Sequence, residues 1–343
     1  MRKQSFIAII VVVFIGVVGF IAYQTVSDDR KIEDNDKLDK ITLALDWTPN
    51  TNHTGLYVAD AKGWYKDEGI DLEILPYSSA TTPDVLVGTN KADVGVSFTE
   101  SIVTSSATDS PVTSIAAILP TNTSSIAVRA DSGIKSLKDL DGRTFGGYGT
   151  AYEEPVMKAA IKNSGGKGEF KNVVVDTGLM DALESKQVDF VWIYEGWDKI
   201  KAEQNGFKIK TFLTKDQGIP DYYTPNLISS LSTIDKKEAV LKRLMKATQK
   251  GYQFAADNPE DSAKLLIKQV DKEFLPNEQL VIDSQKYLAG VYATSDKPWG
   301  FQDKKMWTDY PDFMLKNKAI IDAEGKPITS LDNKSLYTNK LLP

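Results

Sequence analysis

The sequence predicts an α/β protein with two lobes, followed by helices at the C-terminal end. Apolar, β-branched segments alternate with amphipathic segments over 41–212, which is the pattern of β/α units built on parallel strands. The alternation occurs in two successive sets, divided near residue 125. After residue 234 the patterns are only helical, so these segments are expected to cover the lobes without extending a sheet.

The N-terminal 26 residues are expected to form an uncleaved membrane anchor. Residues 6–22 carry no charge and follow Arg2 and Lys3; this run is close to the lower limit of about 17 residues for a membrane-spanning helix. The positive-inside rule places Met1 in the cytoplasm and the remaining chain outside. Residues 27–39 are mostly charged and predict a solvated linker. A cleaved signal is the alternative, and both export the body to the extracytoplasmic side of the cell membrane.

Composition limits the partners and the chemistry. The chain of 343 residues has a net charge of −6, no cysteine and one histidine, His53. A negative chain without basic clusters argues against nucleic acid as a partner. Zinc sites with several Cys or His ligands are excluded, and no metal or cofactor is expected. We expect a monomer.

Each set supplies its own strands and helices. In the first set, strands are expected at 41–45, 71–75, 92–98 and 111–119, with helices after residue 53 and over 83–88. In the second, strands are expected at 125–130, 143–147, 172–176, 189–194 and 207–212. Helices over 236–256, 259–269 and 276–289 follow.

The chain therefore passes between the lobes twice. It leaves the first near residue 125 and returns near 223–230, so lobe 1 comprises 40–125 and 226–343, and lobe 2 comprises 126–225. Two crossings between lobes predict a hinge.

The motif D-W-T-P-N-T-N-H-T-G, residues 46–55, lies where a strand ends and a helix begins. Asp46 and Trp47 are expected at the carboxyl edge of the sheet, where open α/β sheets bind ligands. A carboxylate beside an indole suits a flat ligand with hydrogen-bond donors. The alternative is that Trp47 packs in the core and Asp46 caps the helix. Asn50 and His53 are weaker candidates for ligand contacts.

A glycine-rich stretch, G-G-Y-G-T-A-Y-E-E over 146–154, lies between a strand and a helix. Such a turn exposes backbone N–H groups that can bind an anion, but the lysine of a phosphate-binding P-loop is missing. Tyr148, Tyr152 and Glu153 could instead line a ligand crevice, or the stretch could be only a tight turn.

The stretch D-F-V-W-I-Y-E-G-W, residues 189–197, ends another strand with several aromatic residues. Strand alternation places Trp192 and Tyr194 on the same face. Glu195 at the strand end mirrors Asp46, and a buried carboxylate there requires a partner, which the ligand could supply. Trp197 could stack on a ring, while packing of Trp192 in the core is an open alternative.

Catalysis has little support in the sequence. A Ser-His-Asp triad would need His53, and no G-x-S-x-G motif accompanies it, so no catalytic residue is expected. Glu100, which follows the segment 92–98, could cap a helix or bind ligand hydroxyl or amino groups.

Five motifs over residues 40–290 resemble one family: L-D-W-T-P-N-T-N-H-T-G-L-Y-V-A, K-G-W-Y-K-D-E-G-I-D, K-A-D-V-G-V-S-F, S-L-K-D-L-D-G and V-D-F-V-W-I-Y-E-G-W. The chain resembles the solute-binding proteins of bacterial ABC importers for thiamine pyrimidine precursors. The resemblance implies a periplasmic-binding-protein fold of type II, with formyl-aminopyrimidine or hydroxymethylpyrimidine as ligand. An ABC permease with its ATPase would be the partner, and the membrane anchor would replace the usual lipid-bearing cysteine.

Eukaryotic pyrimidine synthases share this fold and resemble the chain at Trp47, Pro49 and His53. Their reactive lysine and histidine fall on Ser97 and Ser101 here, and their cysteine-rich iron-binding segment is missing. The resemblance therefore implies binding without turnover. Riboflavin or thiamine as ligand, an enzyme similar to the synthases, and an extracytoplasmic sensor are the alternatives.

Overall fold

The computed structural model describes residues 38–343, except 79, 176–177, 276, 293, 323 and 333–334. The expected anchor and nearly all of the charged linker, residues 1–37, lie outside the described part of the chain. Within the described ranges, no helix combines the length and hydropathy that a membrane span requires.

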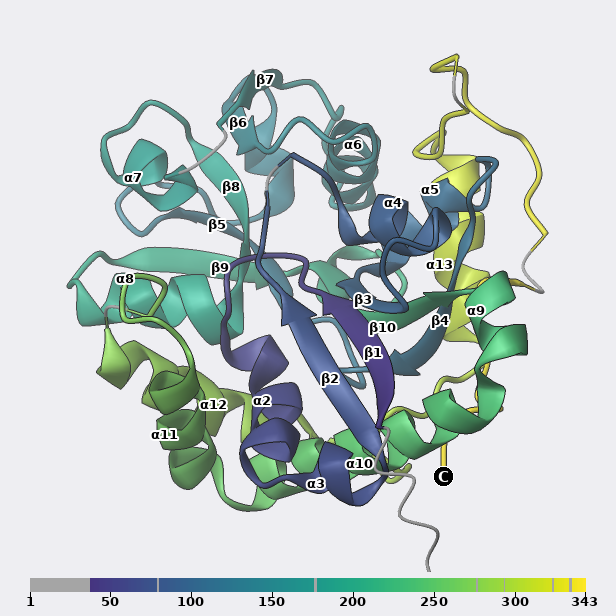
Figure 1. Ribbon diagram of the computed structural model, residues 1–343. Helices are drawn as coiled ribbons and strands as arrows, with labels where there is room; N and C mark the ends of the chain where they lie inside the picture. Colours follow the sequence, from purple (N-terminus) through teal and green to yellow (C-terminus); the bar gives the residue numbers. More distant parts are fainter. Residues whose placement is uncertain are drawn as a thin grey trace, which may run out of the picture. The chain divides into compact units, whose positions relative to one another are not determined.

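Two five-stranded sheets carry the fold (Figure 1). The first has the order β2-β1-β3-β10-β4. In it, β1 is parallel to β2 and β3. Every residue of β3, β4 and β10 is buried, as expected for strands covered on both faces. The strands are β1 (Asp39–Ala44), β2 (Ile70–Leu75), β3 (Val94–Ser97), β4 (Val112–Ala117) and β10 (Asn226–Ser230).

The second sheet has the order β7-β6-β8-β5-β9. Here β6 is parallel to β7 and β8, whereas β5 is antiparallel to β8 and β9. The strands are β5 (Ser124–Arg129), β6 (Thr144–Gly147), β7 (Lys171–Val174), β8 (Phe190–Tyr194) and β9 (Ile209–Leu213).

The strands next to the two crossings run against their neighbours, so the expectation of uniformly parallel units is wrong there. β5 follows the passage from the first sheet to the second, and β10 follows the return and pairs antiparallel with β3 and β4. Parallel neighbours need a crossover connection on one face of the sheet. A strand that enters directly from the other sheet is free of that requirement.

Helices cover both sheets. Those between strands are η1 (Thr51–His53), α2 (Thr54–Ala61), α3 (Trp64–Asp67), α4 (Pro83–Gly88), α5 (Thr99–Ser105), η2 (Leu137–Leu140), α6 (Glu153–Asn163), α7 (Leu179–Glu184), the π-helix η3 (Glu195–Lys199), α8 (Ile200–Gln204) and η4 (Thr214–Gln217). The C-terminal helices are α9 (Leu231–Lys236), α10 (Glu238–Asp257), α11 (Pro259–Gln269), α12 (Glu278–Tyr292) and α13 (Met306–Lys316).

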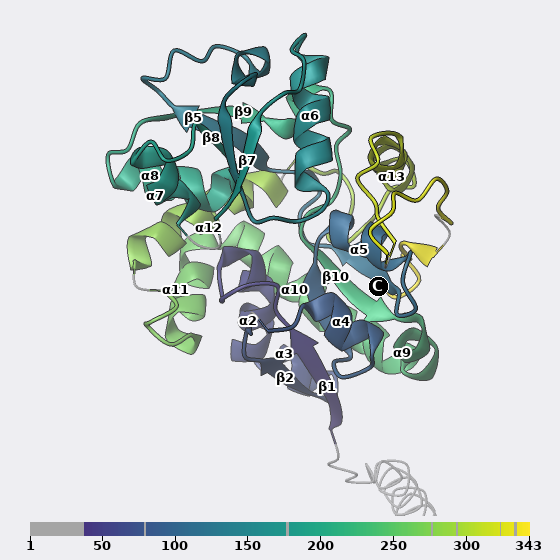
Figure 2. The ribbon, with the colours of Figure 1, turned by 90° about the horizontal axis from the view of Figure 1, so that it is seen from above.

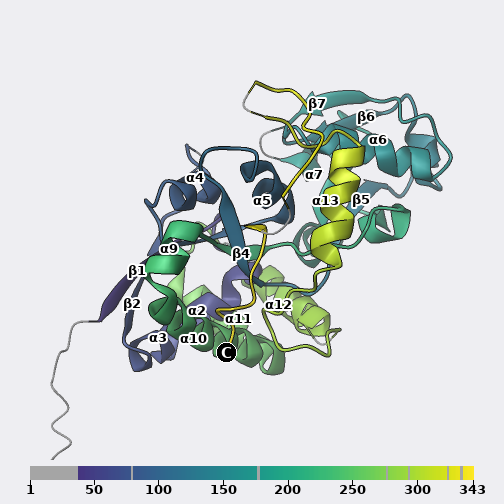
Figure 3. The ribbon, with the colours of Figure 1, turned by 90° about the vertical axis from the view of Figure 1, so that its right-hand side faces the viewer.

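The C-terminal helix α12 contacts elements of both sets. α12 contacts η1 and α10, and also η3 and α8 from the second set (Figure 2). α13, which the sequence patterns did not predict, lies beside α5 (Figure 3), and Tyr310 within it is fully buried.

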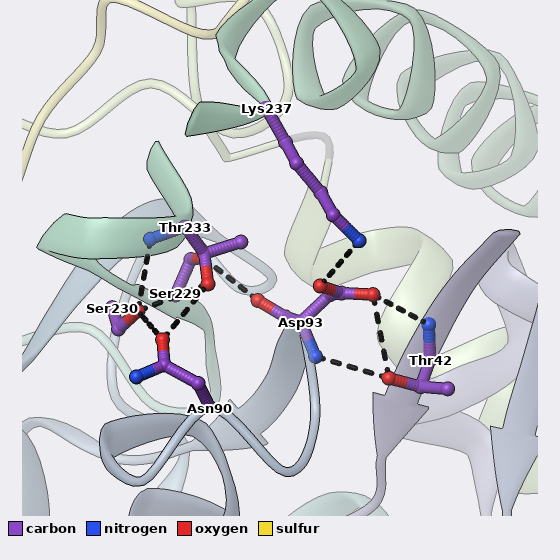
Figure 4. Close-up of polar contacts among 7 residues, drawn as sticks. All are labelled: Thr42, Asn90, Asp93, Ser229, Ser230, Thr233 and Lys237. Atoms are coloured by element: carbon purple, nitrogen blue, oxygen red, sulfur yellow. Dashed lines mark hydrogen bonds and ion pairs between the residues drawn. The ribbon is translucent and has the colours of Figure 1, made fainter. Parts of the chain in front are cut away.

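A polar clamp joins β1, β3 and β10 at the amino end of β3 (Figure 4). The Asp93 carboxylate accepts hydrogen bonds from the Thr42 backbone N–H at 3.1 Å and from Lys237 Nζ at 2.7 Å. The Ser229 hydroxyl donates to the Asp93 carbonyl at 2.7 Å. Because the Asp93 carboxylate is paired inside the protein, the aspartate of the K-A-D-V-G-V motif has a structural role.

Candidate functional site

Asp46 follows β1 and is held by the first residues of the next helix. His53 is fully buried, and its Nε2 lies 2.8 Å from Asp46 Oδ1. Its Nδ1 accepts the Asn50 backbone N–H at 3.2 Å. Because Nδ1 is an acceptor, Nε2 carries the ring proton and donates to Asp46. His53 therefore orients the Asp46 carboxylate and is not placed as a direct ligand contact.

Asn50 uses its side chain inside the same loop. Its Oδ1 accepts the Asn52 N–H at 2.9 Å, and its Nδ2 donates to the Thr48 carbonyl at 3.0 Å. With His53 it forms a capping box at the start of η1. Both polar atoms of Asn50 therefore have partners within the loop, and its contact with a ligand stays a prediction.

Trp47 lies at the protein surface and does not pack in the core. Its side chain is 44% exposed, and its ring lies 5.2 Å from the Tyr77 ring, between centroids, at a tilt of 48°. The two rings make an aromatic surface beside Asp46. The charge of Asp46 also contributes to the raised pKa of Tyr77, after desolvation.

Asp84 at the start of α4 is a further carboxylate near Asp46. Its Oδ1 accepts the Ser97 hydroxyl at 2.7 Å. Burial raises the pKa of Asp84 to about 6, and the charge of Asp46 adds to this rise. The carboxyl groups of Asp46 and Asp84 therefore repel each other across the ends of β1 and β3.

Glu100 is buried and held by tyrosines. The Tyr310 hydroxyl donates to its Oε1 at 3.0 Å, and Tyr222 is a second hydrogen-bond partner. The rings of Tyr222 and Tyr310 stack with centroids 3.7 Å apart. Burial raises the pKa of Glu100 despite these hydrogen bonds. The helix cap considered from sequence is not formed, because α5 has no side-chain cap at its N-terminus.

Tyrosines from the second sheet meet these acids. Tyr194 is 41% exposed, yet desolvation raises its pKa well above the usual range, and the charges of Glu100 and Asp46 contribute. Desolvation also raises the pKa of Tyr152, with Glu100 as the next cause. Charges act in this way only over short distances in protein. The ends of strands from both sheets therefore face one another.

Glu153 is turned into the glycine-rich turn. Its carboxylate accepts the backbone N–H groups of Tyr148, Gly149 and Thr150 at 3.0, 2.8 and 3.0 Å. The side chain is buried. The turn thus binds an anion, as the sequence allowed, but that anion is the protein's own carboxylate. A direct contact of Glu153 with a ligand stays a prediction.

The candidates Trp192 on β8 and Trp197 on η3 pack inside the protein. Trp192 packs with Phe190 in a core cluster, while Val191 and Ile193 belong to another, so the predicted alternation is confirmed. Trp197 is partly buried against the core of the first sheet.

The Glu195 carboxylate, expected to need a partner from the ligand, is already paired within the protein. Its Oε1 accepts the Ser125 hydroxyl at 2.7 Å, and its Oε2 pairs with Lys199 Nζ at 3.0 Å. Burial acts to raise the pKa of Glu195, but hydrogen bonds from Thr211, Ser125 and Lys199 outweigh it and hold the pKa below its ordinary value. The carboxylate therefore has its partners without a ligand.

The structure brings together a set of acids and aromatic residues, which we name the strand-tip cluster. Six of its members were predicted from sequence as ligand contacts: Asp46, Trp47, Glu100, Tyr148, Tyr152 and Tyr194. The cluster comprises Asp46, Trp47, Tyr77, Asp84, Glu100, Tyr148, Tyr152 and Tyr194.

Sequence reasoning missed Tyr77 and Asp84 in this set. Tyr77 comes two residues after the end of β2, as Asp46 does after β1, so the rule that drew attention to Asp46 would have found it. Asp84 follows Pro83 and has the pattern of a first-turn helix acid. Tyr222 and Tyr310, which hold Glu100, lie far along the chain and carry no local signal.

A cavity of about 300 Å³ lies elsewhere, between the C-terminal helices and the loop after α12. Tyr252, Tyr292 and Trp299 are in its wall, and no member of the strand-tip cluster lines it. All of its lining residues come from the first sheet and the C-terminal segments. Because carboxylates and exposed rings gather at the strand tips and not at this cavity, the strand-tip cluster is the stronger candidate.

The model of the "NMT1/THI5 like" family matches residues 50–262, from within the motif after β1 to the first turn of α11. The matched range contains the strand-tip cluster except Asp46 and Trp47, which come just before it. The chain belongs to the NMT1/THI5-like family. The resemblance inferred from the five motifs is thereby confirmed. The expected two-sheet fold of periplasmic binding proteins is confirmed by the sheet topology together with the likeness to solved binding proteins.

Curated relatives of this family member include binding proteins and enzymes. A formylaminopyrimidine-binding protein of Halalkalibacterium halodurans is 28% identical over 80% of this chain and 84% of that protein. A 4-amino-5-hydroxymethyl-2-methylpyrimidine phosphate synthase of Legionella pneumophila is 25% identical over 89% of this chain and 92% of the synthase.

Among solved structures, the ligand-binding component of an ABC-type import system from Staphylococcus aureus has the same fold. Its TM-score is 0.66, with 14% identity over 88% of this chain and 97% of that one. At this identity the likeness concerns the fold alone.

Proposed function

We propose that this protein is an extracytoplasmic solute-binding protein of an ABC importer that captures a thiamine pyrimidine precursor, formyl-aminopyrimidine or hydroxymethylpyrimidine. The observation that carries the proposal is the strand-tip cluster, in which carboxylates from one sheet face tyrosines from the other. Asp46 would accept hydrogen bonds from the exocyclic amine and a protonated ring nitrogen. Trp47 and the tyrosines would stack on the ring.

The name and coverage of the Halalkalibacterium relative support the same ligand class. A permease and its ATPase would receive the ligand from the closed protein. An N-terminal anchor in residues 1–26 would keep the protein at the membrane, and recovery of the full chain in the membrane pellet after a salt wash checks this part.

Calorimetric titration with the two purified aminopyrimidines tests the ligand, with riboflavin and thiamine as comparators. Trp47→Ala is expected to weaken pyrimidine binding by about tenfold or more, because one stacking contact is removed. The fold should be retained, since Trp47 is 44% exposed and lies outside the core. Trp64→Ala, on α3 and outside the strand-tip cluster, is the matched control. Equal affinities of wild type and Trp47→Ala would remove Trp47 from the site.

A pyrimidine synthase activity is the second candidate, favoured by the coverage of the Legionella relative. It is less well supported, because the positions expected for the reactive lysine and histidine hold Ser97 and Ser101. Ser97 is buried and donates to Asp84. Adding pyridoxal phosphate and observing Schiff-base absorbance would favour the enzyme.

A further inference from the structure

The turn before α6 is built as a pocket for one anion. Three successive backbone N–H groups, from Tyr148, Gly149 and Thr150, converge on the Glu153 carboxylate. Convergent backbone N–H groups of this kind form anion-binding concavities in many proteins. The Glu153 side chain comes from the first residue of α6, so the helix that follows the pocket supplies its occupant.

Two glycines specify this arrangement. Gly149 has φ +84°, a conformation that other residues rarely adopt, and a Cβ there would come within 3.0 Å of Val174 Cγ2. A Cβ on Gly147 would lie 3.1 Å from Glu153 Oε2 and 2.6 Å from the Phe145 ring. The backbone therefore approaches the carboxylate more closely than larger residues would allow.

The pocket borders the strand-tip cluster. Tyr148, which donates one of the three N–H groups, has a side chain that is 46% exposed. Tyr152 lies between the turn and Glu153 in sequence, and the charges of Glu100 and Asp84 add to its raised pKa, whose main cause is desolvation. The charge of Glu153 also adds to the raised pKa of Glu100, whose main cause is desolvation. A ligand bound at the cluster would therefore lie next to the N–H groups that Glu153 occupies.

We propose that Glu153 is a built-in anion that closes this N–H pocket and makes the protein reject anionic forms of its ligand, phosphate esters in particular. With the pocket filled, an incoming phosphate finds the N–H groups of Tyr148, Gly149 and Thr150 already occupied. It also meets the acids Asp46, Asp84 and Glu100. The choice of pyrimidines in this inference rests on the proposed function, whereas occupation of the pocket by Glu153 does not.

The test uses the full chain in detergent, as wild type, Glu153→Ala and Glu153→Gln. Glu154→Gln is the matched control, because it removes the same charge one residue later, where the side chain pairs with Lys158 outside the pocket. Thermal unfolding is first compared in sodium formate and sodium chloride at equal ionic strength. Formate is expected to raise the melting temperature of Glu153→Ala selectively, because it is small enough to replace the lost carboxylate.

Calorimetry then compares 4-amino-5-hydroxymethylpyrimidine with its phosphate monoester. Wild type and Glu154→Gln should prefer the alcohol strongly. In Glu153→Ala the preference should fall by about tenfold or more, because charge-assisted hydrogen bonds from the emptied pocket become available to the phosphate. Glu153→Gln keeps most of the side-chain volume and loses the charge, so a smaller fall, of about threefold, is expected.

An unchanged preference in both Glu153 variants would overturn the proposal, as would equal effects of formate on all four proteins. If Glu153→Ala does not fold, the preference measured in Glu153→Gln decides. If the wild type binds neither pyrimidine, the proposed function fails, while selective stabilisation by formate still reports on the pocket.

Discussion

The residues of the strand-tip cluster differ in how far their chemistry was visible in sequence. Asp46 and Trp47 were predicted because both follow a buried strand, and the structure places them beside each other with Trp47 exposed. Glu195 follows a strand in the same way but is paired with Lys199 and Ser125. A strand-end rule locates a side chain and does not reveal its partners, which come from β5 and from one turn further along η3.

The partners of His53 could not be predicted from its sequence position either. It is the single histidine of the chain and sits in the motif that suggests ligand binding. Its two ring nitrogens are both used, by the Asn50 N–H and by Asp46. We therefore propose that His53 acts on a ligand only through the orientation of Asp46, a role that its position in the sequence does not reveal.

Asp84→Asn should make the protein more stable at neutral pH. The pKa of Asp84 is raised to about 6 in the folded state, so the folded protein binds this proton more tightly than the unfolded chain. Stability is then highest below about pH 4 and falls as the pH rises to about 6. The amide can still accept from Ser97 but has no charge to desolvate. We expect a gain of about 1 to 2 kcal/mol above pH 6, after loss of the interaction with the helix dipole.

Urea unfolding at pH 4 and pH 7.5 measures this effect. The advantage of Asp84→Asn should be present at pH 7.5 and absent or reversed at pH 4. Asp181→Asn, in the first turn of α7 at an exposed position, controls for the helix dipole. If the free energies of unfolding of wild type and Asp84→Asn differ by the same amount at both pH values, the raised pKa of Asp84 is contradicted.

At the scale of elements, the positions of the strands in the sequence were predicted more closely than whether each pairs parallel or antiparallel. The helices α4 and α11 begin and end at the predicted residues, since proline marks each start. β10 was not predicted, because N-L-I-S-S lacks a long apolar run. Its polar residues are satisfied by the clamp around Asp93 and by Asn90. Pairing of a short strand with distant neighbours is a property of the tertiary fold.

The contact between α2 and α10 gives a prediction about helix packing. A Cβ on Gly251 would lie 2.0 Å from the Gly55 carbonyl oxygen, so these helices meet at backbone distance. Gly251→Ala should lower the free energy of unfolding by about 1 to 3 kcal/mol through overpacking. Gly290→Ala, on α12 with no atom within 4 Å of the new Cβ, should be neutral or stabilising by up to about 1 kcal/mol.

Urea titrations of the two variants provide the comparison. Because α2 begins directly after His53, displacement of α2 in Gly251→Ala should also disturb the Asp46 carboxylate. Similar stabilities for Gly251→Ala and Gly290→Ala would show that the helices can separate without cost.

At the scale of the whole molecule, the two passages between the sheets are hydrogen-bonded to each other. The Thr121 hydroxyl and the Asn122 N–H donate to the two carboxylate oxygens of Asp221 at 2.5 and 2.9 Å. The outgoing passage between β4 and β5 is thus tied to the returning passage between η4 and β10. We propose that lobes hinge about these passages, and that a ligand at the strand tips favours the closed arrangement by its contacts to both sheets.

Asp221→Ala should therefore loosen the hinge without altering the strand-tip cluster. Because the chain contains no cysteine, Lys91→Cys and Glu184→Cys can carry a spin-label pair, one on each set of elements and both at exposed positions. Without ligand, Asp221→Ala should broaden the distance distribution between the labels, because the two passages lose their common acceptor. At saturating pyrimidine the distribution should narrow to that of the wild type, since the ligand contacts remain.

The control variant is Asp216→Ala, at an exposed position on η4, which should change neither the ligand-free nor the ligand-bound distance distribution. A ligand-free distribution as narrow in Asp221→Ala as in wild type would mean that the passages are held by their other contacts, such as Ile118 N–H to the Pro225 carbonyl at 3.0 Å.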